Sequence, residues 1–360
     1  MDKKVYTIII GTGSYVPSKV IANDFFLDAE FYDPATNKKF ETPNADIIRK
    51  FFEITNIEER RYAEDDQVTS DLATFAAREA IESSGIDPET FEFILVAHNF
   101  GDVVHGILVP DQMPSLANRV KSKLGINNPD ILTNDVTSGC PGWTTAMIIA
   151  DAYIKSGTFK RGLVVGADVL SRVADPYDRD RMIFSDGAGA VIVEAIESDV
   201  PVGILSHASR SDYDHNMLVM GSSANPDNPK DYKYLRMLGS KVYSYALSNV
   251  PGVVKASLDK AGLTLSDIRK VLIHQANEKM DEAILSRVYR LYGQREYDKR
   301  IMPMTIQRFG NSSTATVPTL LDLILKDKMA DHQITNGDII ILTSVGAGMT
   351  INSIVYKMPE

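Results

Sequence analysis

Cysteine and tryptophan are almost absent from this sequence, which has one of each among its 360 residues. A single cysteine cannot form a disulfide within the chain or supply a CxxC-type metal site, so we expect no disulfide framework, no metal cluster of that type and a reducing, cytoplasmic setting. Long apolar runs are absent too, since no stretch of about 18 apolar residues occurs and the opening residues hold too short a run for a signal peptide. We therefore expect no membrane insertion.

Positive charge is also scarce, because 38 Lys and Arg stand against 48 Asp and Glu, for a net charge of −10. Binding to nucleic acid requires a basic surface that neutralises phosphates, so this balance argues against a nucleic-acid partner. Any anionic partner must meet a local basic patch. The hydrophobic content of 44% is that of an ordinary globular protein, long enough for two domains or one large duplicated one.

The single cysteine, Cys140, stands directly before an apolar-periodic segment that runs to about Lys155. The periodicity predicts a helix, and a helix N-terminus offers unpaired N–H groups and partial positive charge that stabilise a thiolate. We therefore expect an activated nucleophile. The alternative is an inert cysteine that acts as a small hydrophobic core residue.

Short runs typical of buried strands alternate with amphipathic helical stretches, which indicates an α/β fold. The strand-like runs are residues 6–10, 93–97, 163–165, 190–194, 271–274 and 339–343.

The sequence also resembles itself. A helix, a capping glycine and a buried strand around Gly85 align with the same elements around Gly262, and the helix after Cys140 aligns with the helix that Asn311 would open. We therefore predict two duplicated halves, residues 1–198 and 199–360, related by a pseudo-twofold axis that brings the two helix starts together.

His274 ends a predicted apolar strand and is followed by polar residues, and α/β folds place their sites at such strand ends. A satisfied core histidine is the alternative, and Asn311 could equally be a helix N-cap. Taken together, Cys140, His274 and Asn311 would supply a nucleophile and hydrogen-bond donors for acyl-transfer chemistry.

Motifs in matching order and spacing make nearly the whole chain resemble ketoacyl synthase III, a family of the thiolase superfamily. The matching segments are residues 11–17, 59–63, 135–142, 166–170, 175–179, 184–190, 274–277, 310–313 and 346–348. The resemblance implies a thiolase-like fold, in which two duplicated α/β halves form a five-layered αβαβα architecture.

The resemblance also implies a 3-oxoacyl-[acyl-carrier-protein] synthase III reaction of fatty acid biosynthesis, without metal or redox cofactor. Cys140 would take an acyl group from a thioester, and an enolate formed by decarboxylation of a malonyl-carrier thioester would attack it. His274 and Asn311 would stabilise the enolate, while the backbone N–H groups of Cys140 and Gly348 would form the oxyanion hole. The family further implies a homodimer, with the apolar stretch 106–114 reaching the partner subunit.

One family feature is missing from the sequence. Members that are primed by acyl-CoA carry a tryptophan and an arginine that sandwich the adenine, and these positions fall at about Lys50 and Ile54 here. Arg179 matches the family's phosphate-contacting arginine. We therefore expect phosphopantetheine delivery, with a preference for a carrier protein over CoA as the priming donor.

Three basic residues, Lys279, Arg287 and Arg290, have spacings that place them on one face of a helix after His274. A solvated helix face is the bland interpretation. Beside a predicted catalytic histidine in an acidic chain, we favour docking of an acidic acyl-carrier protein.

Other features bear on the acyl tunnel. Segments 26–44 and 100–110 are insertions relative to the compact family pattern, and both are expected to reshape the tunnel. Trp143 would either line the tunnel or pack in the core.

Two other functions are considered. A related ketosynthase of secondary metabolism, of dialkylresorcinol or polyketide type, would condense longer acyl or β-ketoacyl thioesters with the same residues. A cysteine hydrolase would use the Cys–His pair with Asn as orienter, but the duplicated fold and the ending 346–348 argue against it. A non-enzymatic binding protein would have little reason to keep the three residues together.

Overall fold

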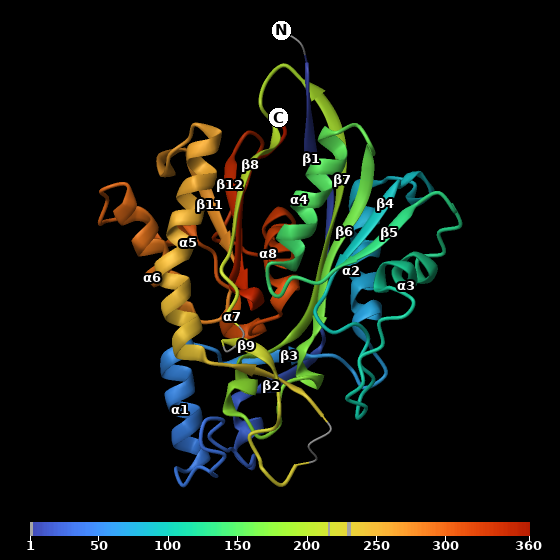
Figure 1. Ribbon diagram of the computed structural model, residues 1–360. Coiled ribbons are helices and arrows are strands. Elements are labelled where there is room, and N and C mark those ends of the chain that lie inside the picture. Colours follow the sequence, from blue (N-terminus) through green and yellow to red (C-terminus); the bar gives the residue numbers. More distant parts are fainter. Residues whose placement is uncertain (1–2, 215–216, 229–231) are drawn as a thin grey trace.

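Two β-sheets face each other across a pair of central helices in the computed structural model, which describes residues 3–214, 217–228 and 232–360 (Figure 1). The first sheet has the strand order β1-β7-β6-β4-β5, and the second has the order β11-β12-β13-β8. The strands of the first sheet are β1 Lys4–Tyr15, β4 Phe93–Ala97, β5 Leu132–Val136, β6 Arg161–Val169 and β7 Asp186–Ser198. Those of the second are β8 Gly203–Ser211, β11 Ile268–Ile273, β12 Ile339–Gly346 and β13 Thr350–Lys357.

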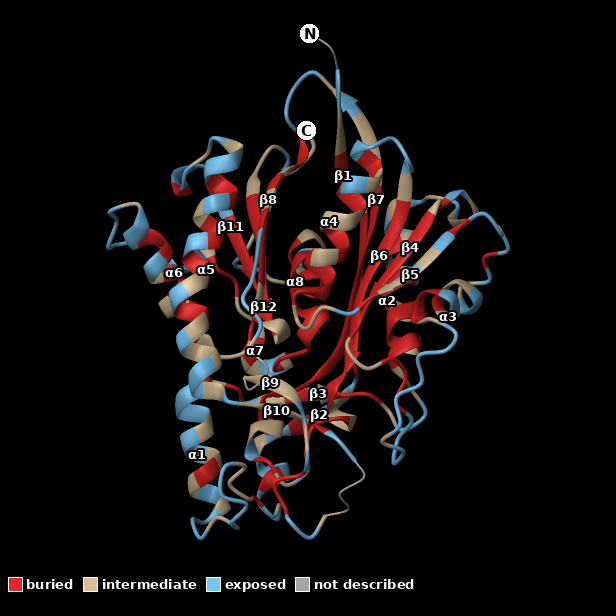
Figure 2. Cartoon of the chain, viewed as in Figure 1, coloured by how far each residue is buried: buried red, intermediate tan, exposed pale blue. Residues whose placement is uncertain are grey.

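Helices cover both sheets on both faces, which confirms the predicted five-layered αβαβα architecture. The central layer is α4 (Gly142–Lys155) and α8 (Thr316–Leu325); α2 (Thr69–Ser84) and α3 (Leu116–Lys123) cover the outer face of the first sheet, and α5 (Gly239–Ala261) and α6 (Glu278–Leu291) cover that of the second. Figure 2 shows the buried residues concentrated on the two sheets and on the central helices.

The remaining elements lie at the ends of the sheets. They are α1 (Asn44–Thr55), α7 (Ile306–Phe309) and the strand pairs β2 (Lys19–Ala22) with β3 (Glu59–Tyr62) and β9 (Leu218–Gly221) with β10 (Tyr234–Met237). No helix in the described part of the chain is long and apolar enough to cross a membrane.

The internal duplication is confirmed by strand order and direction. The series β4-β6-β7-β1 corresponds to β11-β12-β13-β8, with a parallel first pair and antiparallel second and third pairs in each sheet. Gly85 and Gly262 end α2 and α5 in the left-handed region, at φ values of 66° and 69°, which glycine adopts without steric cost. Each glycine therefore ends the corresponding helix ahead of the corresponding strand.

The chain passes from one sheet to the other between Ser198 and Gly203. One apolar cluster nevertheless combines residues from both sides of this crossing, with Trp143 and Val164 packing in the same core as Leu320 and Leu342. The division of the chain into two domains at residue 198 therefore stays a prediction, because the halves share their central core.

The insertion 26–44 builds a small core of its own beside α1, at the lower end of the molecule in Figure 1. Phe26 and Phe31 are buried there together with Met182, and the Arg60 guanidinium lies 5.0 Å from the centre of the Phe26 ring. Such an aromatic contact stabilises a buried cation. The insertion is thus a folded part of the molecule.

Candidate active site

Cys140, His274 and Asn311 all line one cavity of about 230 Å³. They come from three separate elements, since Cys140 precedes α4, His274 follows β11 and Asn311 precedes α8. The two central helices direct their N-terminal ends toward this cavity, as the predicted pseudo-twofold requires. The structure therefore brings the three residues together.

The thiol of Cys140 is protonated in the free enzyme. Burial raises its pKa to about 12, because a thiolate loses hydration in an apolar site, and a hydrogen bond from Ser313 Oγ to Sγ, at 3.4 Å, opposes this effect. The helix α4 begins two residues later, at Gly142. The pKa shift thus runs against the thiolate stabilisation expected from the helix start, because burial outweighs it.

The imidazole of His274 is neutral. Burial lowers its pKa to about 4, and the ring's hydrogen bond to the backbone of Ser313 opposes this effect. The His274 backbone N–H donates to Thr343 O at 2.9 Å, which fixes the residue at the end of the sheet. A neutral ring has one N–H to donate, and in this structure the Ser313 backbone accepts it.

Asn311 is held by its backbone and by one end of its amide. Its N–H donates to Ile183 O, its carbonyl accepts from Ser185 N, both at 2.9 Å, and its Oδ1 accepts from Ser313 N at 2.8 Å. Because Oδ1 is engaged, the amide can present Nδ2 as a donor. Asn311 was expected to open or cap α8. It does neither, because a short 3-10 turn intervenes before α8 begins at Thr316.

A polar network that the sequence did not suggest lies behind the cysteine. Ser313, which bonds Sγ, also accepts a hydrogen bond from Asn99 Nδ2 at 2.9 Å, and Asn99 Nδ2 donates to Asp168 Oδ2 at 2.9 Å. Asp168 further accepts from Thr314 Oγ1 at 2.9 Å, and burial raises the pKa of this carboxyl. Ser313 has a φ of 55°, which is uncommon for a residue with a side chain and marks a constrained turn.

Two glycines allow the cysteine loop and the loop after β12 to touch through their backbones. A Cβ on Gly139 would lie 2.7 Å from Ala347 N, and a Cβ on Gly346 would lie 2.7 Å from Cys140 N, distances that no real side chain tolerates. Gly346 and Ala347 line the cavity, whereas Gly348 is not among its lining residues and gives its carbonyl to Tyr213 N. The hydrogen bond to the Gly348 carbonyl does not involve the Gly348 N–H, so the role of this N–H as an oxyanion-hole donor stays a prediction.

A larger cavity of about 750 Å³ adjoins the catalytic one and shares Met237, Val242, Ala276 and Met280 with it. Lys50 and Ile54, at the positions of the missing adenine clamp, line this larger cavity, here called the entrance cavity, together with Arg179. The Arg179 guanidinium lies 5.0 Å from the centre of the Phe40 ring, which belongs to the insertion 26–44.

Trp143 lies in the hydrophobic core and not in the cavity. It is only 1% exposed and packs among residues of both sheets, and a Cβ on Gly166 of β6 would lie 3.0 Å from the Trp143 Cβ. Trp143 was expected either to line the tunnel and contact substrate or to pack in the core. The structure shows the core, because the helical turn after Cys140 directs this side chain toward β6.

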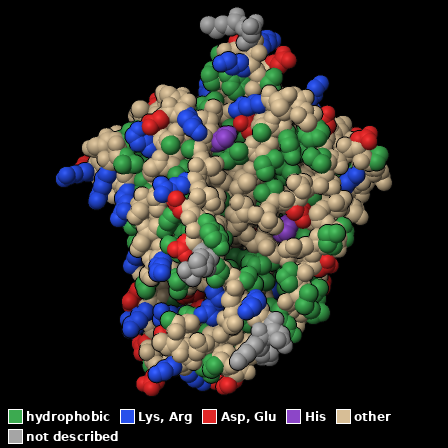
Figure 3. Space-filling view, in the orientation of Figure 1, with side chains coloured by type: hydrophobic (Ala, Val, Ile, Leu, Met, Phe, Trp, Pro, Cys, Tyr) green, Lys and Arg blue, Asp and Glu red, His purple; other side chains and the backbone are tan. Residues whose placement is uncertain are grey.

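The predicted basic face of α6 is exposed, and Figure 3 shows Lys and Arg side chains along the side of the molecule where Figure 1 places α5 and α6. Lys279 donates to Glu53 O at the end of α1, and Arg287 Nη1 donates to Leu247 O of α5 at 3.0 Å. Two of the three basic residues thus tie α6 to its neighbours, and Arg290 is exposed on the same helix.

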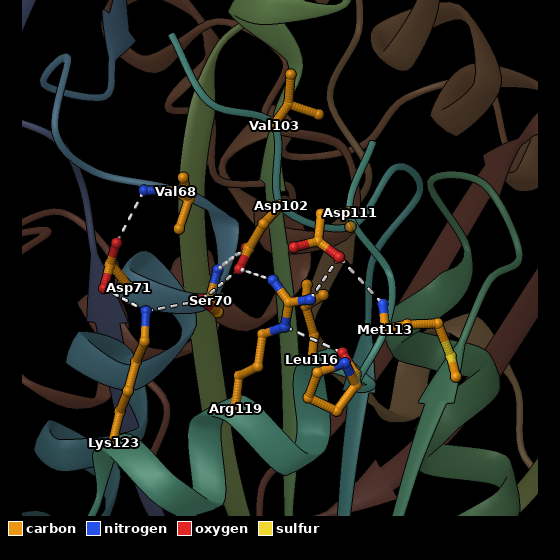
Figure 4. Close-up of polar contacts among 12 residues, drawn as sticks. Val68, Ser70, Asp71, Asp102, Val103, Asp111, Met113, Leu116, Arg119 and Lys123 are labelled. Carbon is orange, nitrogen blue, oxygen red and sulfur yellow. Dashed lines mark hydrogen bonds and ion pairs between the residues drawn. The ribbon is translucent and has the colours of Figure 1, made fainter. Parts of the chain in front are cut away.

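The loop that contains the insertion 100–110 is fixed at its base by Arg119 of α3 (Figure 4). The guanidinium binds Asp102 Oδ2 at 2.8 Å and Asp111 Oδ1 at 2.7 Å, and Asp102 accepts hydrogen bonds from the backbone and the hydroxyl of Ser70 at the start of α2. Beyond these anchors, Ile107, Val109 and Met113 are 55%, 63% and 84% exposed. The loop therefore presents apolar side chains on a fixed base.

Comparison with known proteins gives consistent matches over the whole chain. The profile of 3-Oxoacyl-[acyl-carrier-protein (ACP)] synthase III matches residues 134–213, and that of the C-terminal part of the same family matches residues 258–358. Beta-ketoacyl-[acyl-carrier-protein] synthase III 1 of Vibrio vulnificus is 34% identical over 355 residues, which cover 98% of this chain and 100% of the relative.

Solved structures agree with this. The crystal structure of 3-oxoacyl-[acyl-carrier-protein] synthase III from Aquifex aeolicus has a TM-score of 0.77 and 29% identity, covering 98% of this chain and 99% of the other. A priming beta-ketosynthase from a polyketide biosynthetic pathway has a TM-score of 0.80 and 25% identity, covering 100% of this chain and 98% of the other.

Proposed function

Because the chain belongs to the 3-oxoacyl-[acyl-carrier-protein] synthase III family, a family of condensing acyltransferases of fatty acid biosynthesis, we propose that Cys140 carries the acyl group and His274 and Asn311 serve the condensation. The observation that carries this proposal is the cavity that all three residues line. The chemistry needs no metal or redox cofactor, since a thiolate supplies the nucleophile and loss of CO₂ supplies the carbanion.

In the first half-reaction, Sγ of Cys140 attacks the carbonyl carbon of the donor thioester, and the donor thiol leaves with the proton of the cysteine. Ser313 Oγ, which already bonds Sγ, stabilises negative charge that develops on sulfur. The oxygen of the tetrahedral intermediate accepts from the backbone N–H groups of Cys140 and Gly348. Gly348 directly follows Gly346 and Ala347, which border the cavity beside the cysteine loop.

In the second half-reaction, a malonyl-carrier thioester loses CO₂ and leaves an enolate. The enolate oxygen accepts from the neutral His274 ring and from Nδ2 of Asn311. The enolate carbon then attacks the acyl carbon on Cys140, the carbon–sulfur bond breaks and the 3-oxoacyl thioester departs. A neutral histidine suits this role, since it remains a hydrogen-bond donor without storing a charge in the buried site.

The acyl group is a hydrocarbon chain. Five apolar residues of the β9–β10 pair line the catalytic cavity, namely Leu218, Val219, Met220, Leu235 and Met237. An apolar wall of this kind favours burial of methylene groups over polar primers. The same apolar wall supports the second candidate function, in which the enzyme primes a polyketide-type pathway with a longer acyl chain. The two half-reactions would be the same.

The donor of both thioesters is an acyl-carrier protein. Lys50 and Ile54 provide no aromatic clamp for adenine at the entrance cavity, whereas Arg179 remains available to a phosphate of phosphopantetheine. The exposed basic face of α6 gives an acidic carrier its docking surface. The chain works in the cytoplasm, in keeping with its single free cysteine.

The active form is a homodimer. The exposed apolar tip of the stretch 106–114 on its Arg119-fixed base is a surface suited to a second copy of the chain.

Intact-mass measurement of the loaded enzyme tests the proposed function. Incubation with acyl-carrier and acyl-CoA thioesters of increasing length should add one acyl mass to the wild-type chain and none to Cys140→Ala, whose fold should persist. The longest acyl group that loads gives the chain length that the cavity accepts. An adduct on the Cys140→Ala variant, or thioester hydrolysis without any adduct, would overturn the assignment.

A further inference from the structure

Two buried polar atoms near the end of the second sheet have no hydrogen-bond partner among the described residues. They are Nδ1 of His274 and Oγ of Ser344, and both residues are only 2% exposed. Buried polar atoms of folded proteins are nearly always paired, so each of these atoms calls for a partner. Ser344 has no part in the mechanism above and is absent from the cavity wall.

The two residues are neighbours on adjacent parallel strands. Ile273 of β11 pairs with Thr343 of β12, and the hydrogen bond from His274 N to Thr343 O, at 2.9 Å, continues the ladder so that His274 stands beside Ser344. Neighbouring strands lie about 4.8 Å apart, and residues at one level of a parallel pair point to the same face.

Alternation along the strands shows which face this is. Leu272 and Leu342 pack in the cluster around the central helices, whereas Ile273 and Ile341 pack in the cluster under α5 and α6. His274 and Ser344 follow Leu272 and Leu342 at a spacing of two, so both face the central layer.

The chemistry of the two atoms is complementary. The His274 ring forms a hydrogen bond with the backbone of Ser313, and because Nδ1 has no partner, the nitrogen that donates it is Nε2. A neutral ring with its proton on Nε2 leaves a bare lone pair on Nδ1. The Ser344 hydroxyl is a donor without an acceptor, placed at the same level of the sheet.

We propose that Ser344 is a positioning residue for His274, whose hydroxyl donates to Nδ1 and thereby keeps the ring proton on Nε2. The hydrogen bond forms directly after rotation of the serine side chain, or through one buried water. Its catalytic consequence rests on the proposed function, in which Nε2–H leaves the Ser313 backbone and donates to the enolate oxygen when the extender thioester binds. The tautomer itself does not depend on that function.

Substitution of Ser344 should separate the two half-reactions. Ser344→Ala removes the donor to Nδ1, so only the hydrogen bond to the Ser313 backbone still favours Nε2–H. Part of the rings then take the Nδ1–H form, and condensation slows roughly tenfold, the effect of one hydrogen bond. Loading of Cys140 should keep its rate, because it does not use His274 as a donor. Ser344→Thr should rescue condensation, whereas Ser344→Val, which matches threonine in volume without the hydroxyl, should not.

Nitrogen NMR of ring-labelled histidine tests the tautomer directly. The chain has six histidines, and loss of one signal set in His274→Ala identifies the site. Wild type and Ser344→Thr should show the Nε2–H form, and Ser344→Ala and Ser344→Val a mixture of forms.

The matched control is Ser353→Ala, because Ser353 is a fully buried serine on β13 of the same sheet that bonds Ser257 Oγ at 2.8 Å. It should keep the wild-type tautomer. The proposal is wrong if Ser344→Val shows the wild-type tautomer and condensation rate. Failure of the wild-type enzyme to condense would instead overturn the proposed function and leave the tautomer result standing.

Discussion

At the scale of single residues, burial keeps the reactive groups of this site uncharged. The Cys140 thiol holds its proton because its pKa is about 12, and the His274 ring stays neutral because its pKa is about 4. A thiolate–imidazolium pair, as cysteine hydrolases use, is therefore not formed in the free enzyme. In the proposed mechanism, the thiol gives up its proton when a thioester enters and supplies the leaving thiolate.

The first prediction concerns the reactivity of the thiol toward an alkylating reagent. Below the thiol pKa, the thiolate fraction rises about tenfold per pH unit, so alkylation by iodoacetamide should be slow at neutral pH and should accelerate up to at least pH 10. Intact mass follows the reaction cleanly, since Cys140 is the only cysteine. A rate that levels off below pH 8 would show a preformed thiolate and contradict the account.

At the scale of elements, the sequence predicted what local patterns determine. The apolar periodicity placed the end of α4 at Lys155, and the glycine signals identified Gly85 and Gly262 as helix ends. The same patterns could not say whether Trp143 faces core or cavity, because both environments are apolar. They also gave no test of the Gly348 N–H as an oxyanion-hole donor, since the direction of an N–H group in a turn is a property of the backbone.

The network of Asn99, Asp168 and Ser313 could not be predicted from the sequence, for a different reason. Its members are far apart in the chain, with Asn99 and Ser313 on opposite sides of the pseudo-twofold, and no spacing rule links them. The pKa of Cys140 was misjudged for the same kind of reason, since burial depends on tertiary packing while the helix start is visible locally.

A second prediction concerns α6 as a docking surface. Arg290→Glu should lower kcat/KM for a carrier-bound thioester by about tenfold at low salt and leave the matched CoA ester unaffected, because the charge steers an acidic carrier. The effect should shrink at high salt as exposed charges are screened.

The control is Lys160→Glu, which makes the same charge change at another exposed residue, in the connection between α4 and β6. This variant should leave kcat/KM unchanged for both the carrier-bound thioester and the CoA ester. Equal effects of the two variants, or a marked preference of the wild type for the CoA ester, would mean that the basic face of α6 is only a solvated surface.

At the scale of the whole molecule, the two halves share one core, and the proposed catalytic residues come from both. Cys140 belongs to the first half, and His274 and Asn311 belong to the second. The site therefore exists only when the central helices are packed between the sheets. In the proposed homodimer, a second copy of the chain covers the apolar tip of the loop 106–114, so the active form also depends on that copy.

A third prediction concerns the dimer. Light scattering should give twice the chain mass of 39.7 kDa at micromolar concentration, and Val109→Asp should shift the protein toward the monomer because it places a charge in an apolar contact. Val200→Asp changes a valine of similar exposure, 59% against 63%, and should leave the dimer intact. A wild-type monomer would refute the proposed assembly.

The most direct test of the central claim follows both half-reactions in one experiment. Wild type, His274→Ala and Cys140→Ala are mixed with an acyl-carrier thioester and then with malonyl-carrier thioester, and the acyl-enzyme and the 3-oxoacyl product are measured by rapid-quench mass spectrometry. The account predicts that wild type forms and consumes the adduct. His274→Ala should form the adduct at a similar rate and consume it on the order of a hundredfold more slowly. Product formation by Cys140→Ala, or a parallel loss of both steps in His274→Ala, would contradict it.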